Sequence, residues 1–589
     1  MEQARIGVFV CHCGTNIGAY VDVPQVVEYV KGLPNVVHAE HNLFTCSEEG
    51  ISAIKKAIPK YSLNRVIVAS CTPRTHEPLF RAACEEAGLN KYLFEFVNIR
   101  DQCSWVHMRE PGKATEKAKE LIKMGVAKAR LLQPLEEIEI PVIPSCLVMG
   151  GGVVGMSAAL NLAEQGFEVH LVEKEKELGG TLLDIYKLFP TNEKSSKLIG
   201  PLIQKVKDHS KIKTHLSTKV KDVSGFIGNF NVTLSEAKGL GDSSPELGSG
   251  SDDRFRSESG LRFKVGTIIV AIGAEELKPL GQYGYGTFPN VITQLELEQK
   301  MKGGEFDGQN VVMINCVGAR VPERTYCSRF CCMTAVKNAT LIKENNPTSK
   351  VWLLHRDLMA YGVEFENYYR KSMEQGVRFI RYELEKPPRI IGNGKAEKVK
   401  VWHQLRGREV ELPADMVVLT TPLIPRVDNE EISKMLKVPL SEQGFFLEAH
   451  LKLMPVEFAT DGIYLCGSAR WPTDIAEGVS QAYAAASKAV IPMRRGYVKP
   501  EAITALVDED KCSGCGTCEP VCPFKAIELQ ARDGKRVSHV SEAVCKGCGT
   551  CGAACPAGAI IMNHFRDVEI LAQIEVLFSS CPIYWASRS

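Results

Sequence analysis

The sequence has almost no net charge and no long uninterrupted apolar run. Its 71 Lys and Arg residues are balanced by 70 Asp and Glu residues, which leaves a formal charge of +1. Proteins that bind nucleic acid or anionic membranes carry a basic excess, so neither partner is expected. The most apolar stretch, residues 141–163, is broken by three consecutive glycines, and no apolar signal region opens the sequence. We therefore expect a cytoplasmic protein without a membrane span.

Cysteine, by contrast, is abundant, with 21 residues in a chain of 589. A disulfide framework is typical of short secreted chains that cannot build a sufficient core. A chain of this length has room for about four domains of roughly 150 residues, each able to bury a core without disulfides. The cysteines are therefore expected to serve as metal ligands in a reducing compartment.

Breaks in composition divide the chain into three predicted domains, residues 1–140, 141–500 and 501–589. Prolines interrupt the sequence between residues 132 and 144, and a second break precedes the densest cysteines near residue 500. Within the middle domain, residues 236–262 are rich in Gly and Ser and predict a flexible surface loop. The middle domain is long enough to be double.

A dinucleotide-binding motif opens the middle domain. Residues 146–155 form a short apolar run that ends in G-x-G-x-x-G, with Gly150, Gly152 and Gly155 at the three positions. The first glycine permits a tight turn, the second lets the backbone approach a pyrophosphate, and the third packs the following helix on the strand. A small-residue helix and a second strand follow, and Glu173 at the end of that strand can accept both ribose hydroxyls. The motif alone leaves FAD and NAD open.

Three further segments, residues 175–180, 266–274 and 460–468, resemble the thioredoxin-reductase-like flavoproteins, which have two dinucleotide-binding domains. The resemblance implies an α/β flavoprotein core that binds FAD, and it assigns further flavin contacts to Gly180, Gly273, Gly467 and Ser468. Ser468 stands where the family has an aspartate that contacts the ribityl chain. A serine hydroxyl can still bond to that chain, so FAD remains the expected cofactor.

The expected second nucleotide subdomain, about residues 305–420, lacks the motif that a nicotinamide cofactor needs. The apolar strand 311–315 is followed by Cys316-Val-Gly-Ala-Arg320 and not by a glycine triplet, and no Cys-x-x-Cys pair occurs in the middle domain. NAD(P)H binding and dithiol exchange are therefore not expected. Four thiolates in a C-x10-C-x3-C-C pattern suit a tetrahedral or cubane metal site, with buried thiols acting as small hydrophobes as the alternative. The four candidate ligands are Cys316, Cys327, Cys331 and Cys332.

The C-terminal domain carries two copies of the run C-x2-C-x2-C-x3-C-P. Bacterial ferredoxins with two [4Fe–4S] clusters have this run, and the fourth cysteine of each copy ligates the other cluster. A zinc site would instead show pairs separated by about a dozen or more residues. We predict an α+β ferredoxin domain that conducts electrons. One cluster is assigned to Cys512, Cys515, Cys518 and Cys555, and the other to Cys545, Cys548, Cys551 and Cys522.

The N-terminal domain alternates strands and helices over residues 1–131, which predicts a parallel sheet with crossover helices. Ligands of such sheets collect outside the carboxyl ends of the strands, so four of the five cysteines that follow strand ends can hold one cluster. Ordinary thiols at loop starts are the alternative, and the choice between Cys11 and Cys13 is open. The strands are expected at residues 6–10, 37–44, 65–69 and 92–97, and the helices near 24–31, 48–57, after Pro78 and at 113–131. The five cysteines are Cys11, Cys13, Cys46, Cys71 and Cys103.

In this order, the three domains resemble the HdrA-like family, the FAD and iron–sulfur subunits of heterodisulfide reductase. The resemblance implies one [4Fe–4S] cluster in the N-terminal domain and another at the cysteines of residues 316–332. It also implies that Lys337 lies beside the flavin and can hydrogen-bond N5, whereas a solvated helix lysine is the alternative. Some members carry an inserted ferredoxin that this chain lacks, so four clusters and not six are expected. The resemblance rests on the flavin and ferredoxin motifs and on residues 10–14, 69–74, 102–107, 326–337 and 467–475.

The resemblance further implies electron bifurcation, in which FAD takes an electron pair and sends one electron to a high-potential acceptor and the other to ferredoxin. The implied partners are HdrB- and HdrC-like subunits, an electron-donor subunit of hydrogenase or formate dehydrogenase type, and ferredoxin, in a multimeric complex. An electron relay in a benzoyl-CoA-reductase-type or Qmo-type complex is one alternative. A stand-alone NAD(P)H disulfide reductase and a structural or redox-sensing protein are the others.

Overall fold

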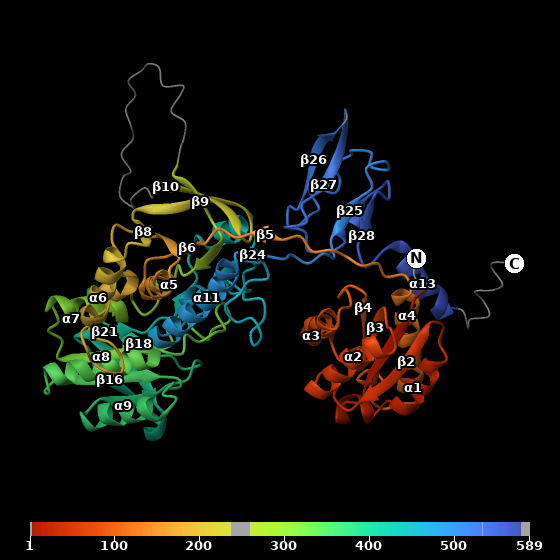
Figure 1. The fold of residues 1–589 in the computed structure, drawn as a ribbon. Helices are drawn as coiled ribbons and strands as arrows, with labels where there is room; N and C mark the ends of the chain where they lie inside the picture. Colours follow the sequence, from red (N-terminus) through yellow and green to blue (C-terminus); the bar gives the residue numbers. More distant parts are fainter. Residues whose placement is uncertain (1–2, 237–259, 533, 579–589) are drawn as a thin grey trace, which may run out of the picture. The chain divides into compact units, whose positions relative to one another are not determined.

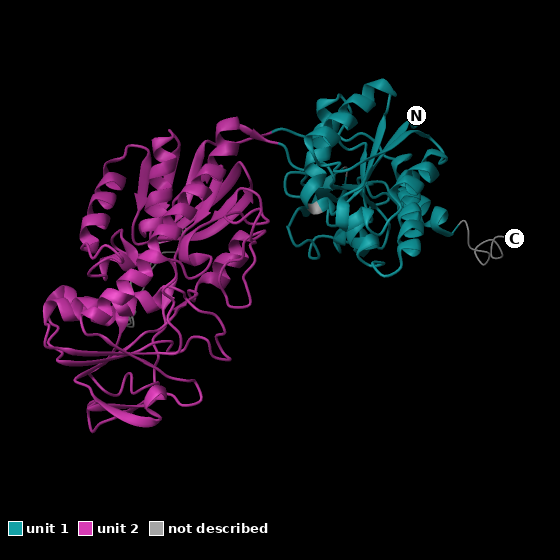
Figure 2. Ribbon diagram, turned by 90° about the horizontal axis from the view of Figure 1, so that it is seen from below, with its two compact units in different colours: residues 1–139, 499–589 teal, residues 140–498 magenta. Residues whose placement is uncertain are grey.

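The computed structural model describes residues 3–236, 260–532 and 534–578. The chain folds into two compact units, one that combines residues 1–139 with 499–589 and one that spans 140–498 (Figure 2). These bounds lie close to the predicted domain boundaries, but the first and third predicted domains share a unit. The predicted loop 236–262 falls almost wholly outside the described residues.

The first unit contains a parallel sheet in the order β2-β1-β3-β4. Strand β1 is central and fully buried, because its almost wholly apolar sequence is covered on both faces, as parallel sheets require. The parallel α/β fold expected for the N-terminal residues is confirmed. The strands are β1 (Ile6–Cys11), β2 (Val36–Asn42), β3 (Arg65–Ser70) and β4 (Phe94–Asn98), and the helices are α1 (Val23–Lys31), α2 (Glu48–Lys60), α3 (Pro73–Glu86) and α4 (Pro111–Ala129).

Helix α3 differs from the sequence prediction, which placed its start after Pro78. The helix begins at Pro73, because the first helical turn needs no N–H from proline and the fixed φ of proline suits it. Pro78 lies inside the helix, so this proline does not mark a boundary.

The C-terminal residues of the first unit form two small antiparallel pairs. Strand β25 (Ala505–Val507) pairs with β28 (Ile560–Met562), and β26 (Ile527–Arg532) pairs with β27 (Lys535–Val540). The short helix α12 (Thr550–Ala554) precedes β28, and α13 (Asp567–Phe578) follows it and packs along α4. The Arg566 guanidinium, just before α13, donates to the backbone carbonyl of Leu131. These contacts join the C-terminal segment to the N-terminal sheet.

The second unit contains two parallel sheets, and β6 and β8 of the first are labelled in Figure 1. This first sheet has the order β23-β12-β6-β7-β8. Three helices share one core with one face of this sheet, and the antiparallel sheet β11-β10-β9 shares a second core with the other face. The strands of the parallel sheet are β6 (Ser145–Met149), β7 (Glu168–Val172), β8 (Ile212–His215), β12 (Thr267–Val270) and β23 (Ile463–Leu465). The helices are α5 (Val153–Glu164), α6 (Ser195–Asp208) and α11 (Ile475–Arg495), and the antiparallel strands are β9 (Thr218–Phe226), β10 (Asn229–Glu236) and β11 (Arg262–Val265).

The second sheet has the parallel order β14-β21-β15-β16-β17. It packs with α7 (Gln294–Gly303), α8 (Cys331–Asn345) and α9 (Val363–Glu374) and with an antiparallel sheet of β18 (Arg389–Ile391), β19 (Lys398–His403) and β20 (Arg408–Pro413). Two nucleotide-type sheets in one unit confirm the predicted thioredoxin-reductase-like core. The strands of the second sheet are β14 (Val291–Thr293), β15 (Asn310–Ile314), β16 (Lys350–His355), β17 (Arg378–Arg381) and β21 (Met416–Leu419).

Two short strand pairs and one helix complete the second unit. Strand β5 (Ile140–Pro141) pairs with β24 (Tyr497–Val498) where the chain enters and leaves the unit. Strand β13 (Glu275–Glu276) pairs with β22 (Leu423–Ile424), and helix α10 (Asn429–Leu436) follows. Within the described ranges, none of the helices combines the length and apolar character that crossing a membrane requires.

Candidate functional site

The predicted flavin motif forms the turn between β6 and α5. Gly150 has a φ of +107°, and a Cβ there would lie 2.4 Å from the Ala271 carbonyl oxygen. A Cβ at Gly155 would lie 1.9 Å from the Gly150 carbonyl oxygen, so the third glycine allows α5 to pack against the turn. Gly152, at the N-cap of α5, opens instead on free space. The helix N-terminus and this open space fit a pyrophosphate.

Glu173 lies directly after β7 and is buried. Its carboxylate accepts the backbone N–H of Gly151 at 2.6 Å and of Glu175 at 2.9 Å. These bonds hold a negative charge beside the glycine turn, which is where the ribose hydroxyls of a bound dinucleotide lie. The side chain therefore fits its predicted role, and the role itself stays a prediction.

The structure places two further predicted flavin contacts around the N-terminus of α5. A Cβ at Gly180, which has a φ of +55°, would lie 3.2 Å from the Gly152 Cα, and one at Gly467 would lie 3.0 Å from the Val154 side chain. The Ser468 hydroxyl donates to the Thr473 carbonyl at 3.3 Å. Gly273 has a φ of +74° and open space beside it. The contact of Ser468 with a ribityl chain stays a prediction.

The second sheet carries cysteines where a nicotinamide-binding domain carries its phosphate site. Cys316 follows β15 with a φ of +63°, a left-handed conformation that normally favours glycine. Cys331 and Cys332 are the first two residues of α8. A helix N-terminus attracts anions, and the groups that lie at this one are thiols, where a nicotinamide-binding domain holds phosphates.

The four thiols of residues 316–332 lie within electrostatic range of one another. Burial raises the pKa of Cys316 to about 11. The hydrogen bond between the two adjacent thiols raises the pKa of Cys331 and lowers the pKa of Cys332 to about 7. The backbone N–H of Arg329 donates to the Cys327 sulfur at 3.3 Å. Four neighbouring thiols fit the ligand set of a cluster, and this role stays a prediction.

Positive charge lies next to these thiols. Arg320 pairs with Asp357 at 2.7 Å, and the Arg356 guanidinium donates to the carbonyls of Ala319 at 3.2 Å and Arg320 at 3.1 Å. Both guanidinium charges favour the thiolate form of Cys316 against the larger effect of burial on its pKa.

Among the described residues, no three Cys, His, Asp or Glu side chains form a site for a single metal ion. In a cubane each cysteine binds a different iron, so its ligands stand further apart.

The ferredoxin-like segment surrounds a small cavity with cysteines from both of its runs. Cys545, Cys548 and Cys551 of the second run line this cavity together with Cys522 of the first. The backbone N–H of Ala505 points at the Cys545 sulfur at 3.5 Å, and that of Ala526 at the Cys522 sulfur at 3.3 Å. These are the four cysteines that the crossed-ligand pattern assigns to one cluster.

Four of the five N-terminal cysteines interact with one another at the carboxyl edge of the first sheet. Electrostatic interactions link Cys71 to Cys11 and Cys46, and Cys11 to Cys13. Cys103 lies in a short π-helix, residues Arg100–Ser104, and its thiol donates to the Ala114 carbonyl at 3.0 Å. Burial raises the pKa of Cys103 to about 11. The ligand set stays a prediction.

Lys337 is a buried residue of α8, so the alternative of a solvated helix lysine is excluded. Its ammonium pairs with the carboxylate of Glu298 on α7 and donates to the Lys187 carbonyl at 2.7 Å. The second oxygen of Glu298 accepts the Tyr186 N–H at 2.9 Å. Burial lowers the pKa of Lys337, and the charge of Glu298 opposes that effect. The sequence carries no local signal for Glu298.

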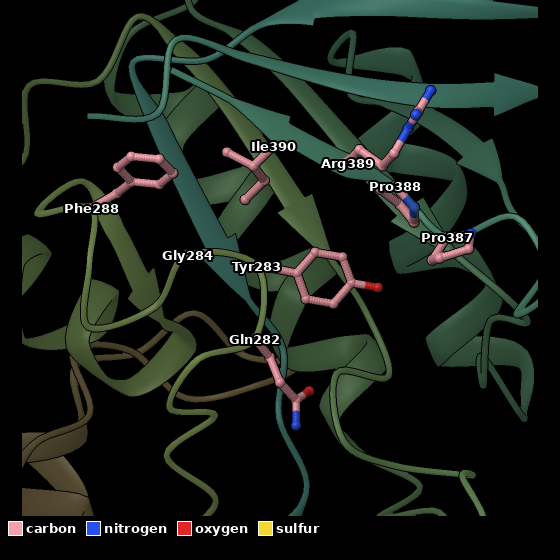
Figure 3. A pocket seen from close by; sticks show the side chains of 8 residues that line it. All are labelled: Gln282, Tyr283, Gly284, Phe288, Pro387, Pro388, Arg389 and Ile390. Atoms are coloured by element: carbon pink, nitrogen blue, oxygen red, sulfur yellow. The ribbon is translucent and has the colours of Figure 1, made fainter. Parts of the chain in front are cut away.

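A separate hollow of about 380 Å³ lies on the second sheet's side of the unit, between residues 282–288 and β18 (Figure 3). Tyr283, Phe288 and Ile390 surround it. Its lining, taken over the described residues, contains no cysteine and none of the predicted flavin contacts, so the hollow is distinct from the sites above.

Comparison with known proteins decides the family. A family model described as pyridine nucleotide-disulphide oxidoreductase matches residues 144–489, and one described as 4Fe-4S dicluster domain matches residues 505–562. An iron-sulfur A-subunit of CoB--CoM heterodisulfide reductase from Methanopyrus kandleri is 41% identical, with 98% of each chain covered. The chain belongs to the HdrA family of heterodisulfide reductase. The A-subunit of the H(2):CoB-CoM heterodisulfide,ferredoxin reductase of Methanothermobacter thermautotrophicus is also 41% identical, over 98% of this chain and 97% of its own.

Membership in the HdrA family makes the chain an oxidoreductase subunit of the flavin and iron–sulfur type. The alignment with the Methanopyrus kandleri protein spans 659 positions, more than the 589 residues of this chain. That relative therefore has residues without a counterpart here.

Proposed function

We propose that this chain binds one FAD and four [4Fe–4S] clusters and transfers electrons, with bifurcation, in a heterodisulfide reductase complex. The observation that carries the proposal is the second nucleotide subdomain. Its strand end and helix N-terminus hold Cys316, Cys331 and Cys332 at the place where a nicotinamide-binding domain binds phosphate. Such a subdomain suits electron transfer through clusters and not hydride transfer from a nicotinamide.

Individual residues would have separate roles in cofactor binding and electron transfer. Bound FAD exchanges electrons in pairs or singly, and each cluster carries one electron. Glu173 and the N-terminus of α5 would bind and orient the dinucleotide end. The buried Lys337–Glu298 pair would hold an ammonium proton on the flavin side of α8. Arg320 and Arg356 would favour the more negative, reduced state of the neighbouring cluster.

The proposed partners follow from the family. One relative is named for hydrogen, heterodisulfide and ferredoxin, and another, from Methanococcus maripaludis, for hydrogen or formate with the same two acceptors. We propose HdrB- and HdrC-like subunits as the high-potential branch, ferredoxin as the low-potential acceptor, and a donor subunit of hydrogenase or formate dehydrogenase type. The complex would be cytoplasmic and multimeric.

Iron and flavin analysis of the full chain tests the cofactor content. Anaerobically purified and reconstituted chain should hold one FAD and about sixteen irons, four at each of four sites. Cys332→Ala should remove about four irons and leave the rest in place. Serine substitution of each N-terminal cysteine should remove about four irons in four variants and none in the fifth. A wild-type chain with far less iron would refute the proposal.

Coupled turnover of the native complex separates bifurcation from a simple relay. A bifurcating complex reduces ferredoxin only while its high-potential acceptor is also being reduced. A relay of the benzoyl-CoA-reductase or Qmo type moves electrons to one acceptor without the other. Ferredoxin reduction that proceeds at the same rate without the high-potential acceptor would refute bifurcation and leave the cofactor assignment standing.

A further inference from the structure

A chain of buried polar side chains runs through the second nucleotide subdomain and ends at the cysteines of residues 316–332. Asn338 on α8 donates from Nδ2 to Oε1 of Gln294 on α7 at 2.8 Å. Gln294 donates from Nε2 to the Thr420 hydroxyl at 3.0 Å, and that hydroxyl donates to Oδ1 of Asn315 at 2.7 Å. Each of the four residues is at most 5% exposed.

Asn315, the last residue of this polar chain, has a buried donor group without a partner among the described residues. Its Nδ2 amide makes no hydrogen bond with the described residues, although Asn315 is 0% exposed. Buried polar groups are almost always paired, so this amide faces a position where an acceptor is expected. Asn315 directly precedes Cys316, and its side chain faces the Cys332 thiol. The available acceptor is therefore a sulfur of this cysteine site.

The backbone around Asn315 holds the residue in place. The Tyr382 hydroxyl donates to its carbonyl at 2.6 Å, and its own N–H donates to the Leu354 carbonyl at 2.9 Å. Thr420 is fixed in turn, because its N–H donates to the Ile314 carbonyl at 2.8 Å and its carbonyl accepts the Val317 N–H at 3.1 Å. The two side chains therefore meet at the ends of adjacent strands, β15 and β21.

The direction of the polar chain decides which end of the amide faces the sulfur. The Thr420 hydroxyl has one hydrogen, and because it accepts from Gln294, it gives that hydrogen to Oδ1 of Asn315. Nδ2 is then left for the cysteine site. If every hydrogen bond of the polar chain were reversed, Oδ1 of Asn315 would face the cysteine sulfurs. A carbonyl oxygen and a thiolate are both acceptors and repel each other. A negative sulfur therefore favours the direction that the structure shows.

We propose that Asn315 donates a hydrogen bond from Nδ2 to a cluster sulfur at the Cys332 position, and that Thr420, Gln294 and Asn338 orient it. The inference rests on the proposed cluster at residues 316–332. A hydrogen bond to a cluster sulfur stabilises the reduced state, which is the more negative one, and so raises the reduction potential. Asn315 acts on the cluster directly, and Thr420 acts through Asn315 as a positioning residue.

Redox titration of the full chain, followed by electron paramagnetic resonance, tests this inference. The cluster is identified as the signal that Cys332→Ala removes. Asn315→Leu removes the donor and should lower the midpoint potential by a tenfold change in the ratio of reduced to oxidised cluster, about 59 mV for a one-electron couple. Thr420→Val frees the amide to rotate and should shift the potential in the same direction by less.

Thr421→Val is the matched control, because Thr421 is the next residue, is buried and makes no side-chain hydrogen bond within the described part of the chain. It should leave the potential unchanged, and the ferredoxin clusters should be unchanged in every variant. An unaltered potential in Asn315→Leu, with iron retained, would overturn the inference. If Asn315→Leu loses iron, an unaltered potential in Thr420→Val would overturn it. Absence of the Cys332-dependent signal in the wild-type chain would instead overturn the proposed function.

Discussion

At the scale of single residues, the glycines of the flavin motif differ in what a side chain would meet. We expect Gly155→Ala to destabilise the fold by roughly 3 kcal/mol or more and to abolish FAD binding, because its Cβ would collide with the Gly150 carbonyl. Gly152→Ala should keep the thermal stability of the apoprotein and still lose FAD, because its methyl group fills only the space for pyrophosphate. Thermal unfolding and flavin absorbance measure both. Gly200→Ala, in open space on α6, should change neither, and FAD retained by Gly152→Ala would contradict the placement.

Substitution of Lys337 tests whether the flavin contacts the second nucleotide subdomain. In Lys337→Ala the Glu298 carboxylate stays buried without a counter-charge, which costs roughly 3 kcal/mol of unfolding free energy. The negative charge left behind should lower the flavin reduction potential while FAD content is retained, which spectroelectrochemical titration measures. Lys343→Ala is the control, because Lys343 lies on the same helix and its ammonium donates to backbone carbonyls. Equal flavin potentials in the wild type and Lys337→Ala would remove Lys337 from the flavin site.

At the scale of elements, a buried ion pair between β4 and α4 also contacts His564 of the C-terminal segment. Glu95 on β4 lies 2.8 Å from the ammonium of Lys128 on α4, and His564 lies 3.4 Å from the same carboxylate. Glu95→Gln leaves Lys128 buried without a counter-charge, so we expect the free energy of unfolding to fall by roughly 3 kcal/mol. Amide hydrogen exchange of α13 should become faster at neutral pH, since α13 begins just after His564 and packs along α4.

The pKa of Glu95 fixes the pH range of that experiment. Burial alone would raise it, but the hydrogen bond from His564 and the charge of Lys128 outweigh burial, and the pKa lies below the usual 4.5. The stabilisation is therefore complete above about pH 4.5 and is lost only as the pH falls through the lower, folded-state pKa. Glu116→Gln should leave exchange unchanged, because the Glu116 carboxylate that pairs with Lys119 on α4 is exposed. Unchanged exchange in Glu95→Gln would contradict the role of the pair.

The sequence predicts those elements and site residues whose signal is local. Apolar runs and glycine spacing are enough for the parallel sheets, the turn at Gly150 and the cysteine runs, because each depends on neighbouring residues. Glu298, Asn315 and Thr420 come from separate elements and carry no motif, so only the folded chain reveals that they meet the predicted sites. The contact of Arg566 with Leu131 joins residues 435 positions apart, which no local pattern encodes. Pro78 shows the opposite error. A proline commonly marks a helix start, but α3 begins at Pro73 and Pro78 lies inside it.

At the scale of the whole molecule, the second unit keeps the two-sheet architecture of nicotinamide-dependent flavoproteins and replaces its second phosphate site with thiols. We therefore expect NADH and NADPH to leave the flavin of the purified full chain oxidised, because thiolates at the N-terminus of α8 and Cys316 at the strand end exclude a pyrophosphate by charge and by volume. Anaerobic absorbance spectroscopy measures this, and dithionite, which needs no nucleotide site, is the control that shows the flavin to be reducible. Rapid bleaching by one equivalent of NADH would instead make the chain a stand-alone dehydrogenase. Slow or absent bleaching would agree with the proposed donor subunit, which would dock on the chain instead of diffusing in as a nucleotide.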